Sequence, residues 1–336
     1  MTLLAGRPHG DVVDLAIMVV STNEAHWLEP CLRTVFEHAG DATLDVVVVD
    51  NESTDGTREL VESGFPEARV VASSNHGFGH ANNRGALTCN ARYMLFLNPD
   101  TEIVSGTFGE LVAAMDERPL VGLAGVKQMT ADGALSETIR YFPGPMRALG
   151  EALLSERWPR RPRWSGEREL DFSLYEHEME CDWTSGSFML SRTEALLSSG
   201  LMDERYFLYA EEPDLCLRMK RDGWQVRHLP CMSIIHHVGK AGIRPRNAAQ
   251  DAFARMQYAR KHFSAPRRAA YLAAVALRHA LRAVVPGGTE EGGKRRRAAR
   301  AALSTLAGRT PPPFGAPPPT ALAADAALLA RQNVTA

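Results

Sequence analysis

Short apolar runs alternate with amphipathic segments through the first hundred residues of the chain. The run YMLFL at 93–97 is apolar or aromatic at every position, which is typical of a strand buried on both faces. Similar runs predict further strands at 12–21, 44–49 and 69–72. Apolar residues at helical spacing predict helices between them, at 25–38, at 56–62 and up to about residue 91. Strands that alternate with helices indicate an α/β fold with a mostly parallel sheet.

The second half of the chain has a less regular pattern. It predicts helices at 105–117, 192–199 and 213–222 and strands at 121–126, 187–191, 226–229 and 234–235. Residues 140–180 are rich in Pro, Arg and Trp, and we interpret them as a long functional loop or an insertion. Helical patterns return at 248–263 and 267–285, and the composition of 286–336 predicts a disordered tail. The expected domains are therefore 1–242, the helices at 243–285, and the tail.

Composition restricts the class of protein. The formal net charge of −2 over 336 residues gives no sign of a nucleic-acid partner. The five cysteines are scattered and lack a CxxC pair, which favours reduced thiols in a cytoplasmic protein over disulfides or a zinc site. We find neither the apolar core of a signal peptide nor a window apolar enough to span a bilayer. The expectation is a protein in the cytoplasm or on the inner face of its membrane.

Carboxylates follow several of the predicted strands or sharp turns. The central strand stops at Asn98-Pro99-Asp100, because Pro99 cannot continue the hydrogen-bond ladder. Asp50 follows the second strand, and the cluster Glu211-Glu212-Pro213-Asp214 precedes a helix. Ligands of open α/β sheets bind beyond the carboxyl ends of the strands. A lone acid there usually caps a turn or a helix, but three such sites in one sheet indicate a common polar cleft.

The Glu211-Glu212 pair has two interpretations. Acids in the first turn of a helix stabilise its N-terminus, and Pro213 marks such a terminus. However, the apolar and aromatic residues at 207–210 lead directly into the pair. A carboxylate against an apolar wall has a raised proton affinity, as a general base requires.

Two further segments carry polar residues that could bind a ligand. Residues 75–85 contain Gly77 and Gly79, but Asn82 stands where a dinucleotide fingerprint has its third glycine. We interpret the segment as a loop that lets backbone approach a ligand, with Asn82 as a side-chain donor. His236 and His237 could be ordinary polar residues at a strand end, or one of them could join Asp100 in binding a divalent cation.

Seven segments in order along residues 15–242 resemble the family-2 inverting glycosyltransferases of GT-A fold, and most closely their bacterial rhamnosyltransferase branch. The segments are VVSTNE, VVDNESTDGT, NHGFGHANNRG, LFLNPDTE, DWTSGSFMLSR, DERYFLYAEEPDLCLRMKRDGW and HHVGKAG. The resemblance implies a mostly parallel, doubly wound sheet with a helical C-terminal extension. It also implies a donor half at about 12–126 and an acceptor half at about 127–242.

By this resemblance the donor is a nucleotide sugar, and Thr22, Glu24 and Asp50 hold its nucleoside. Asn98-Pro99-Asp100 stands where the family has its DxD motif, so Asp100 alone would carry the Mg²⁺ or Mn²⁺ ion that bridges the diphosphate. The full expected donor set is Thr22, Glu24, Asp50, Asn51, Gly79, Asn82 and Asn98. The expected metal ligands are Asp100 with His236 or His237.

The resemblance also implies an acceptor pocket and a base. Trp183, Ser185 and Gly186 would line the pocket, although core packing explains Trp183 equally well. Glu212 would take the proton of the acceptor hydroxyl as this attacks the anomeric carbon in a single inverting displacement. Glu211 and Asp214 are the alternative bases.

The expected activity is transfer of L-rhamnose from dTDP-rhamnose to a hydroxyl of a glycan or polyprenyl-linked glycan in cell-envelope polysaccharide assembly. The alternatives are a UDP-sugar donor or a small-molecule acceptor on the same fold, and an inactive module that binds a sugar nucleotide. The helix at 267–285 is apolar on one side and bears Arg267, Arg268, Arg278 and Arg282 on the remainder. It could lie on an anionic membrane surface or be an ordinary docked helix with a solvated face.

Overall fold

The computed structural model describes residues 12–153, 162–237, 244–284 and 290–314. Its centre is a nine-stranded sheet with the order β3-β2-β1-β4-β10-β6-β11-β5, and β8 pairs with the remaining length of β11. The strands are β1 (Val13–Ser21), β2 (Leu44–Asn51), β3 (Ala68–Ser73), β4 (Ala91–Leu97), β5 (Thr101–Ser105), β6 (Val121–Met129), β8 (Met179–Glu180), β10 (Phe188–Arg192) and β11 (Gln225–His236). A separate two-stranded sheet joins β7 (Ile139–Arg140) to β9 (Trp183–Thr184). The predicted α/β fold is confirmed.

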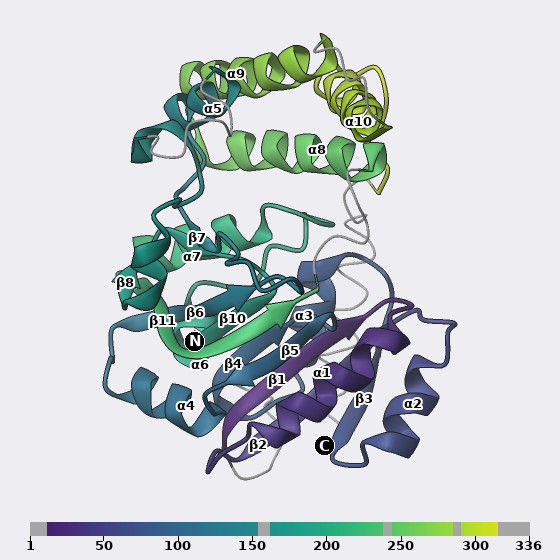
Figure 1. The fold of residues 1–336 in the computed structure, drawn as a ribbon, viewed down its shortest axis with the longest axis vertical. Helices are drawn as coiled ribbons and strands as arrows, with labels where there is room; N and C mark the ends of the chain where they lie inside the picture. The colour runs from purple at the N-terminus through teal and green to yellow at the C-terminus, as the bar shows by residue number, and fades with distance from the viewer. Residues whose placement is uncertain (1–11, 154–161, 238–243, 285–289, 315–336) are drawn as a thin grey trace.

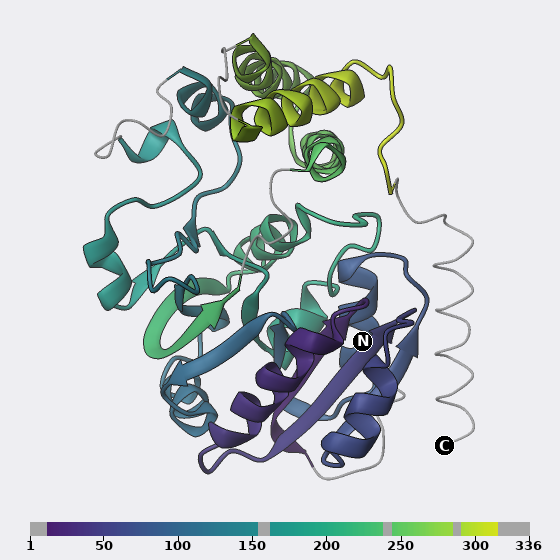
Figure 2. The ribbon, with the colours of Figure 1, turned by 45° about the vertical axis from the view of Figure 1, so that its right-hand side comes forward.

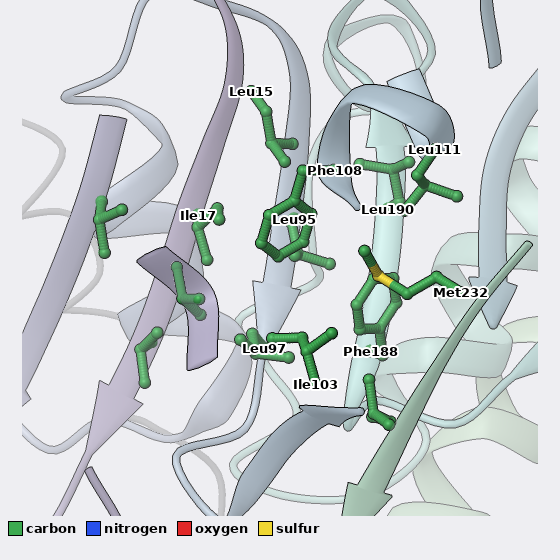
Figure 3. Close-up of a cluster of buried hydrophobic side chains, with 14 of the residues drawn as sticks. Leu15, Ile17, Leu95, Leu97, Ile103, Phe108, Leu111, Phe188, Leu190 and Met232 are labelled. Atoms are coloured by element: carbon green, nitrogen blue, oxygen red, sulfur yellow. The ribbon is translucent and has the colours of Figure 1, made fainter. Parts of the chain in front are cut away.

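Helices cover both faces of the large sheet (Figure 1). Leu15, Ile17 and Val19 of β1 pack on one face with α1 (Ala25–Glu37), α2 (Thr57–Gly64) and α4 (Phe108–Asp116), and Figure 3 shows part of this cluster. The alternate residues of β1 pack on the other face with α3 (Phe78–Ala86), α6 (Thr193–Ser198) and α7 (Glu211–Arg221). Because both faces are buried, the strands read as continuous apolar runs and not as alternating ones.

A group of helices stands apart from the sheet, at the top of Figure 1 and again in Figure 2. We call this group the helical cap; it comprises α5 (Pro145–Leu153), α8 (Pro245–His262), α9 (Ala265–Val284) and α10 (Glu290–Leu306). Its own apolar cluster includes Ala148 of α5, Tyr258 of α8 and Tyr271 of α9. The cap therefore has a core of its own, to which the segment after β7 contributes a helix.

Several predicted elements differ from those observed. The helix expected at 105–117 begins only at Phe108, because Thr101–Ser105 forms the edge strand β5. Residues 140–180 are not one long loop, since they contain α5, the 3₁₀ helices Arg163–Ser165 and Phe172–Glu176, and β8. The two strands expected at 226–229 and 234–235 are one strand, β11, with a register shift between His228 and Ser233.

The expectation of a disordered tail from 286 is wrong for the part that the structure describes, because residues 290–306 form α10. Its buried face consists of small residues, Ala298, Ala299 and Ala302, which let it pack closely on its neighbours. Lys294 pairs with Glu290 and Arg295 with Glu291, one helical turn apart. The segment is therefore helical, with buried alanines on one face and ion pairs on its surface, although its composition is otherwise typical of disorder. Residues 315–336 lie outside the described ranges.

The turn before α3 is locked to the segment that leads into α7. The backbone N–H of Phe78 donates to the carbonyl oxygen of Phe207 at 2.9 Å. Gly77 has φ of 107°, and a Cβ atom there would lie 2.2 Å from the same oxygen. This backbone region is open essentially only to glycine. Gly77 therefore makes room for the backbone of Phe207. The sequence had instead predicted that this segment makes room for a ligand.

We predict that Gly77→Ala lowers the free energy of unfolding by about 3 kcal/mol or more, from backbone strain together with the clash. Gly56→Ala is the matched control, because Gly56 also has positive φ but has no atom within 4 Å of an added Cβ. It should cost only about 1 kcal/mol. Denaturant unfolding of both variants measures the difference, and equal losses would show that the contact with Phe207 does not matter.

Candidate active site

The ends of three parallel strands gather the first group of predicted site residues. β1 lies between β2 and β4, with Ser21 opposite Asp50 and Val19 opposite Leu97. The segments that follow these strands therefore meet at one edge of the sheet. Thr22 and Glu24 follow β1, Asp50 and Asn51 end β2, and Asn98 and Asp100 follow β4.

Asp50 and Asn51 have different surroundings at this edge. Asp50 is partly exposed, and its Oδ1 accepts from the backbone N–H of Ser53 at 2.9 Å. Asn51 is 4% exposed, and its amide donates to Thr22 Oγ1 and to Asn75 Oδ1. Thr22 itself is exposed. Asp50 and Thr22 are thus open to a ligand, whereas Asn51 ties neighbouring strand ends together.

Asp100 lies beside His236 from the far end of β11. The Asp100 Oδ1 atom is 3.1 Å from His236 Nε2, and the Asn98 amide nitrogen is 3.4 Å from the same ring nitrogen. His237 points elsewhere: its Nε2 is 2.6 Å from Glu102 Oε1, and its ring stacks on Trp27 at 4.7 Å. The geometry therefore separates the two histidines and brings only the side chain of His236 to Asp100.

Negative charge accumulates around Asp100. Burial raises the pKa of Glu24 to about 7, and the nearby carboxylates of Asp100 and Asp55 add to the rise. A cation bound near Asp100 would relieve this repulsion. Carboxylate and imidazole from Asp100 and His236 are chemically suited to Mg²⁺ or Mn²⁺. Among the described side chains no group of three or more His, Cys, Asp or Glu is arranged to hold a metal, so diphosphate oxygens and water would complete its shell.

The three acids at the start of α7 have different surroundings. Asp214 is fully buried and is bonded by Arg218 at 2.8 Å and by Lys261 and His262 at 2.6 Å each. Burial opposes its ionisation, but these partners outweigh that cost and lower the pKa of Asp214. The prediction of Asp214 as an alternative base is not supported, because this carboxylate anchors α7 to α8 of the helical cap.

Glu211 is also enclosed, with 1% of its surface exposed. Its Oε2 has no hydrogen-bond partner among the described residues. Burial, followed by the charge of Glu212, raises the pKa of Glu211 well above its usual range. Glu211 is therefore enclosed beside Glu212, where its charged form is disfavoured. That position is unsuited to taking a proton from a bound acceptor.

Glu212 is the member of the cluster that faces the predicted acceptor turn. A Cβ atom added to Gly186 would lie 2.6 Å from Glu212 Oε1, so the Glu212 carboxylate packs directly against this glycine. Burial raises the pKa of Glu212, although backbone N–H groups and the cation of Arg140 oppose the rise. A partly exposed carboxylate with a raised pKa has the properties of a general base.

One backbone contact joins the Asp100 region to the Glu212 region. The N–H of Asn98 donates to the carbonyl oxygen of Ser187 at 3.0 Å. Ser187 adjoins Gly186, on which Glu212 rests. Asp100 and Glu212, 112 positions apart in the printed numbering, are therefore linked through Asn98, Ser187 and Gly186. This path is the structural link between the two carboxylates.

The glycine-asparagine segment does not join this surface through its predicted side chains. An added Cβ on Gly79 would meet Met202 at 3.2 Å, and the Asn82 amide donates to the carbonyl oxygen of Phe78 at 3.0 Å. Asn83 bonds Met202 and Glu204. Gly79 and Asn83 hold α3 against the segment before α7, and Asn82 bonds within α3, so these contacts favour a structural role over donor binding.

Trp183 occupies an intermediate position between core and surface. Its Nε1 donates to the carbonyl oxygen of Tyr141 at 2.9 Å, and part of its ring packs against the core. The Arg140 guanidinium lies over the ring, 5.4 Å from its centroid. The Ser187 hydroxyl donates to Ser185 Oγ at 3.1 Å. Sequence reasoning missed Arg140, and the one available signal was the richness of 140–180 in Arg and Trp.

Comparisons with known proteins identify the family of the chain. The sequence profile of "Glycosyl transferase family 2" matches residues 16–166. N-acetylglucosaminyl-diphospho-decaprenol L-rhamnosyltransferase of Mycobacterium tuberculosis is 30% identical over 235 residues, which are 66% of this chain and 76% of that protein. Rhamnosyltransferase WbbL of Escherichia coli is 23% identical over 229 residues, 66% of this chain and 82% of that one.

Solved structures support the fold. The structure of S. aureus TarS 1-349 has a TM-score of 0.52 at 15% identity, covering 87% of this chain and 81% of that one. The same protein in complex with UDP-GlcNAc gives 0.51 at 15% identity, covering 88% and 84%. From the profile match and the mycobacterial relative, this chain belongs to glycosyl transferase family 2, within its rhamnosyltransferase-like branch.

Proposed function

We propose that this glycosyltransferase moves L-rhamnose from dTDP-rhamnose to a hydroxyl of a lipid-linked glycan, with inversion and with a divalent cation. The two relatives are named as rhamnosyltransferases, and the name of the mycobacterial one gives N-acetylglucosaminyl-diphospho-decaprenol as its acceptor. The observation that carries the proposal is the contact path from Asp100 through Asn98 and Ser187 to Glu212. This path supports a shared site for a candidate metal ligand and a candidate base.

The donor binds over the first half of the domain. Thr22 and Asp50 are open at the strand edge and contact the nucleoside. Asp100 and His236 would hold Mg²⁺ or Mn²⁺, and such a cation would neutralise charge on the leaving diphosphate. Glu24 adds a nearby carboxylate to the same region.

The acceptor binds on the other side, against the turn that contains Trp183 and Gly186. Glu212 removes the proton from the acceptor hydroxyl as the oxygen forms a bond to the anomeric carbon. The bond from that carbon to the diphosphate oxygen breaks, its electron pair leaves with the nucleoside diphosphate, and the proton stays on Glu212. One displacement inverts the anomeric centre, and no covalent enzyme intermediate forms.

Thermal shift with a panel of nucleotide sugars identifies the donor. With Mg²⁺ present, dTDP-rhamnose should raise the melting temperature more than UDP-sugars at equal concentration, because a ligand of the folded state stabilises it. A larger shift with a UDP-sugar would replace the donor in this proposal. Stabilisation without any turnover across acceptors would instead favour an inactive sugar-nucleotide-binding module.

The helical cap also presents a surface suited to an anionic membrane. Within the described ranges, no helix combines the length and apolarity needed to cross a bilayer. Exposed large apolar residues nevertheless gather on α5, the adjoining 3₁₀ helix and α9: Met146, Leu153, Trp164, Leu277, Leu281 and Val284. α9 contains arginines but no acidic residue. Apolar side chains on a helix that also bears arginines suit an interface with anionic lipid headgroups, and this supports our proposal that the enzyme binds the inner face of the membrane.

We predict that Glu212→Gln lowers turnover by a factor of about 10² to 10⁴ while leaving donor affinity unchanged. In the wild type the rate should rise with pH as Glu212 loses its proton, and the raised pKa moves this acid limb above the usual range of a glutamate. Steady-state kinetics and donor titration measure both effects. Glu194→Gln, at an exposed acid in the first turn of α6, is the control. An active Glu212→Gln enzyme would remove Glu212 from the base role.

We predict that Asp100→Asn and His236→Ala each raise the Mn²⁺ concentration for half-maximal turnover by about 10-fold or more. His237→Ala is the neighbouring control, since that ring contacts Glu102 and Trp27. Metal titration of the four proteins checks the assignment. Equal effects of the two histidine variants would contradict it.

We predict that the double variant Leu281→Glu/Val284→Glu loses about 10-fold or more of its binding to phosphatidylglycerol vesicles, because charge replaces apolar contact beside anionic lipid. Leu120→Glu alters another exposed leucine, outside the cap, and should bind as the wild type does. Vesicle sedimentation measures the bound fraction. Wild-type binding that is no stronger than to neutral phosphatidylcholine vesicles would end the membrane proposal.

A further inference from the structure

Arg140 is a cation that the proposed chemistry leaves without a role. It lies on β7 directly opposite Trp183 of β9, and its guanidinium covers that indole ring at 5.4 Å. Its Nε atom is enclosed and has no hydrogen-bond partner among the described residues. Burying a charged donor without an acceptor costs free energy, so an arginine at this position needs an explanation.

The acids around Arg140 are already paired with other arginines. Glu137 binds Arg168 at 2.7 Å, and Glu167 binds Arg255 at 2.8 Å. Burial and the neighbouring charge of Arg168 lower the pKa of Arg140, which shows that its positive charge is poorly compensated. Within the described part of the chain, the guanidinium therefore lacks a carboxylate of its own.

Arg140 lies on the acceptor side of the candidate base. Its charge acts on the Glu212 carboxylate, although the two form no contact short enough to be an ion pair among the described residues. Glu212 in turn rests on Gly186, three residues after Trp183 in the printed sequence. The Arg140 guanidinium, the Trp183 ring and the Glu212 carboxylate thus lie in one region of the structure. The contact path from this region to Asp100 runs through Ser187 and Asn98.

We infer that Arg140 binds a phosphate group of the acceptor, so that the enzyme selects a sugar phosphate or diphosphate over an uncharged glycan. This inference rests on the proposed function and assigns a residue to its acceptor class. A guanidinium presents paired N–H donors that match phosphate oxygens, and the adjacent indole suits a sugar ring. A bound phosphate group would compensate the positive charge of Arg140, which no described carboxylate pairs.

Two acceptors that differ only in charge test the inference. One is a short-chain alkyl diphosphate of N-acetylglucosamine, and the other is the alkyl glycoside of the same sugar. In the wild type the diphosphate should have the lower KM, and Arg140→Gln should raise that KM by about 10-fold or more while leaving kinetics with the glycoside and donor affinity unchanged. Arg168→Gln, at the neighbouring arginine that Glu137 pairs, is the matched control.

Other outcomes overturn the inference. An equal loss with both acceptors and a shifted pH profile would make Arg140 a counter-ion of Glu212. A loss of donor affinity would assign it to the donor. Direct calorimetric binding of the diphosphate to the protein with dTDP and Mg²⁺ tests Arg140 even if turnover is not observed. Binding that depends on Arg140 without turnover would support this inference while the proposed function fails, and binding that does not depend on Arg140 would refute the inference.

Discussion

The hydrogen bond from the N–H of Asn98 to the carbonyl oxygen of Ser187 is the constraint on which the site depends. Pro99 ends the β4 ladder, and β10 then runs antiparallel beside β4 with Phe188 opposite Leu97. This pairing aligns the end of the central strand with the turn that supports Glu212. Without the pairing of β4 with β10, the strand ends that carry Asp50 and Asp100 would have no fixed position relative to Glu212.

A second constraint fixes the elements that carry Glu211 and Glu212. Phe207 contacts Gly77 through its backbone, and Asp214 is held by Lys261 and His262 of α8. Tyr209 and Ala210 between these anchors both have positive φ, at 73° and 70°. Such backbone is unfavourable for residues with side chains and persists only where the surroundings hold it. The start of α7 is therefore rigidly placed, which general-base catalysis requires.

The sequence was sufficient for features that local chemistry determines. Continuous apolar runs predicted β1, β2 and β4, and breaks at Asp50 and Pro99 located the ends of β2 and β4. The partners of Asp214, the contact at Gly77 and the charge of Arg140 were not predictable, because each depends on residues distant in the chain. Glu211 and Glu212 look alike in sequence, yet helical geometry turns one inward and the other toward Gly186. The helix α10 was missed because alanine packing has no signature in composition.

We propose that Asp50, Asp100 and Glu212 border one pocket for an activated sugar and its cation. The most direct measurement is a crystal structure of the enzyme with Mn²⁺, dTDP and an acceptor analogue. We predict Mn²⁺ density on Asp100 and His236, the nucleoside beside Asp50, and the acceptor hydroxyl within hydrogen-bond distance of Glu212. Nucleotide bound away from the β1, β2 and β4 ends, or an acceptor remote from Glu212, would contradict the account.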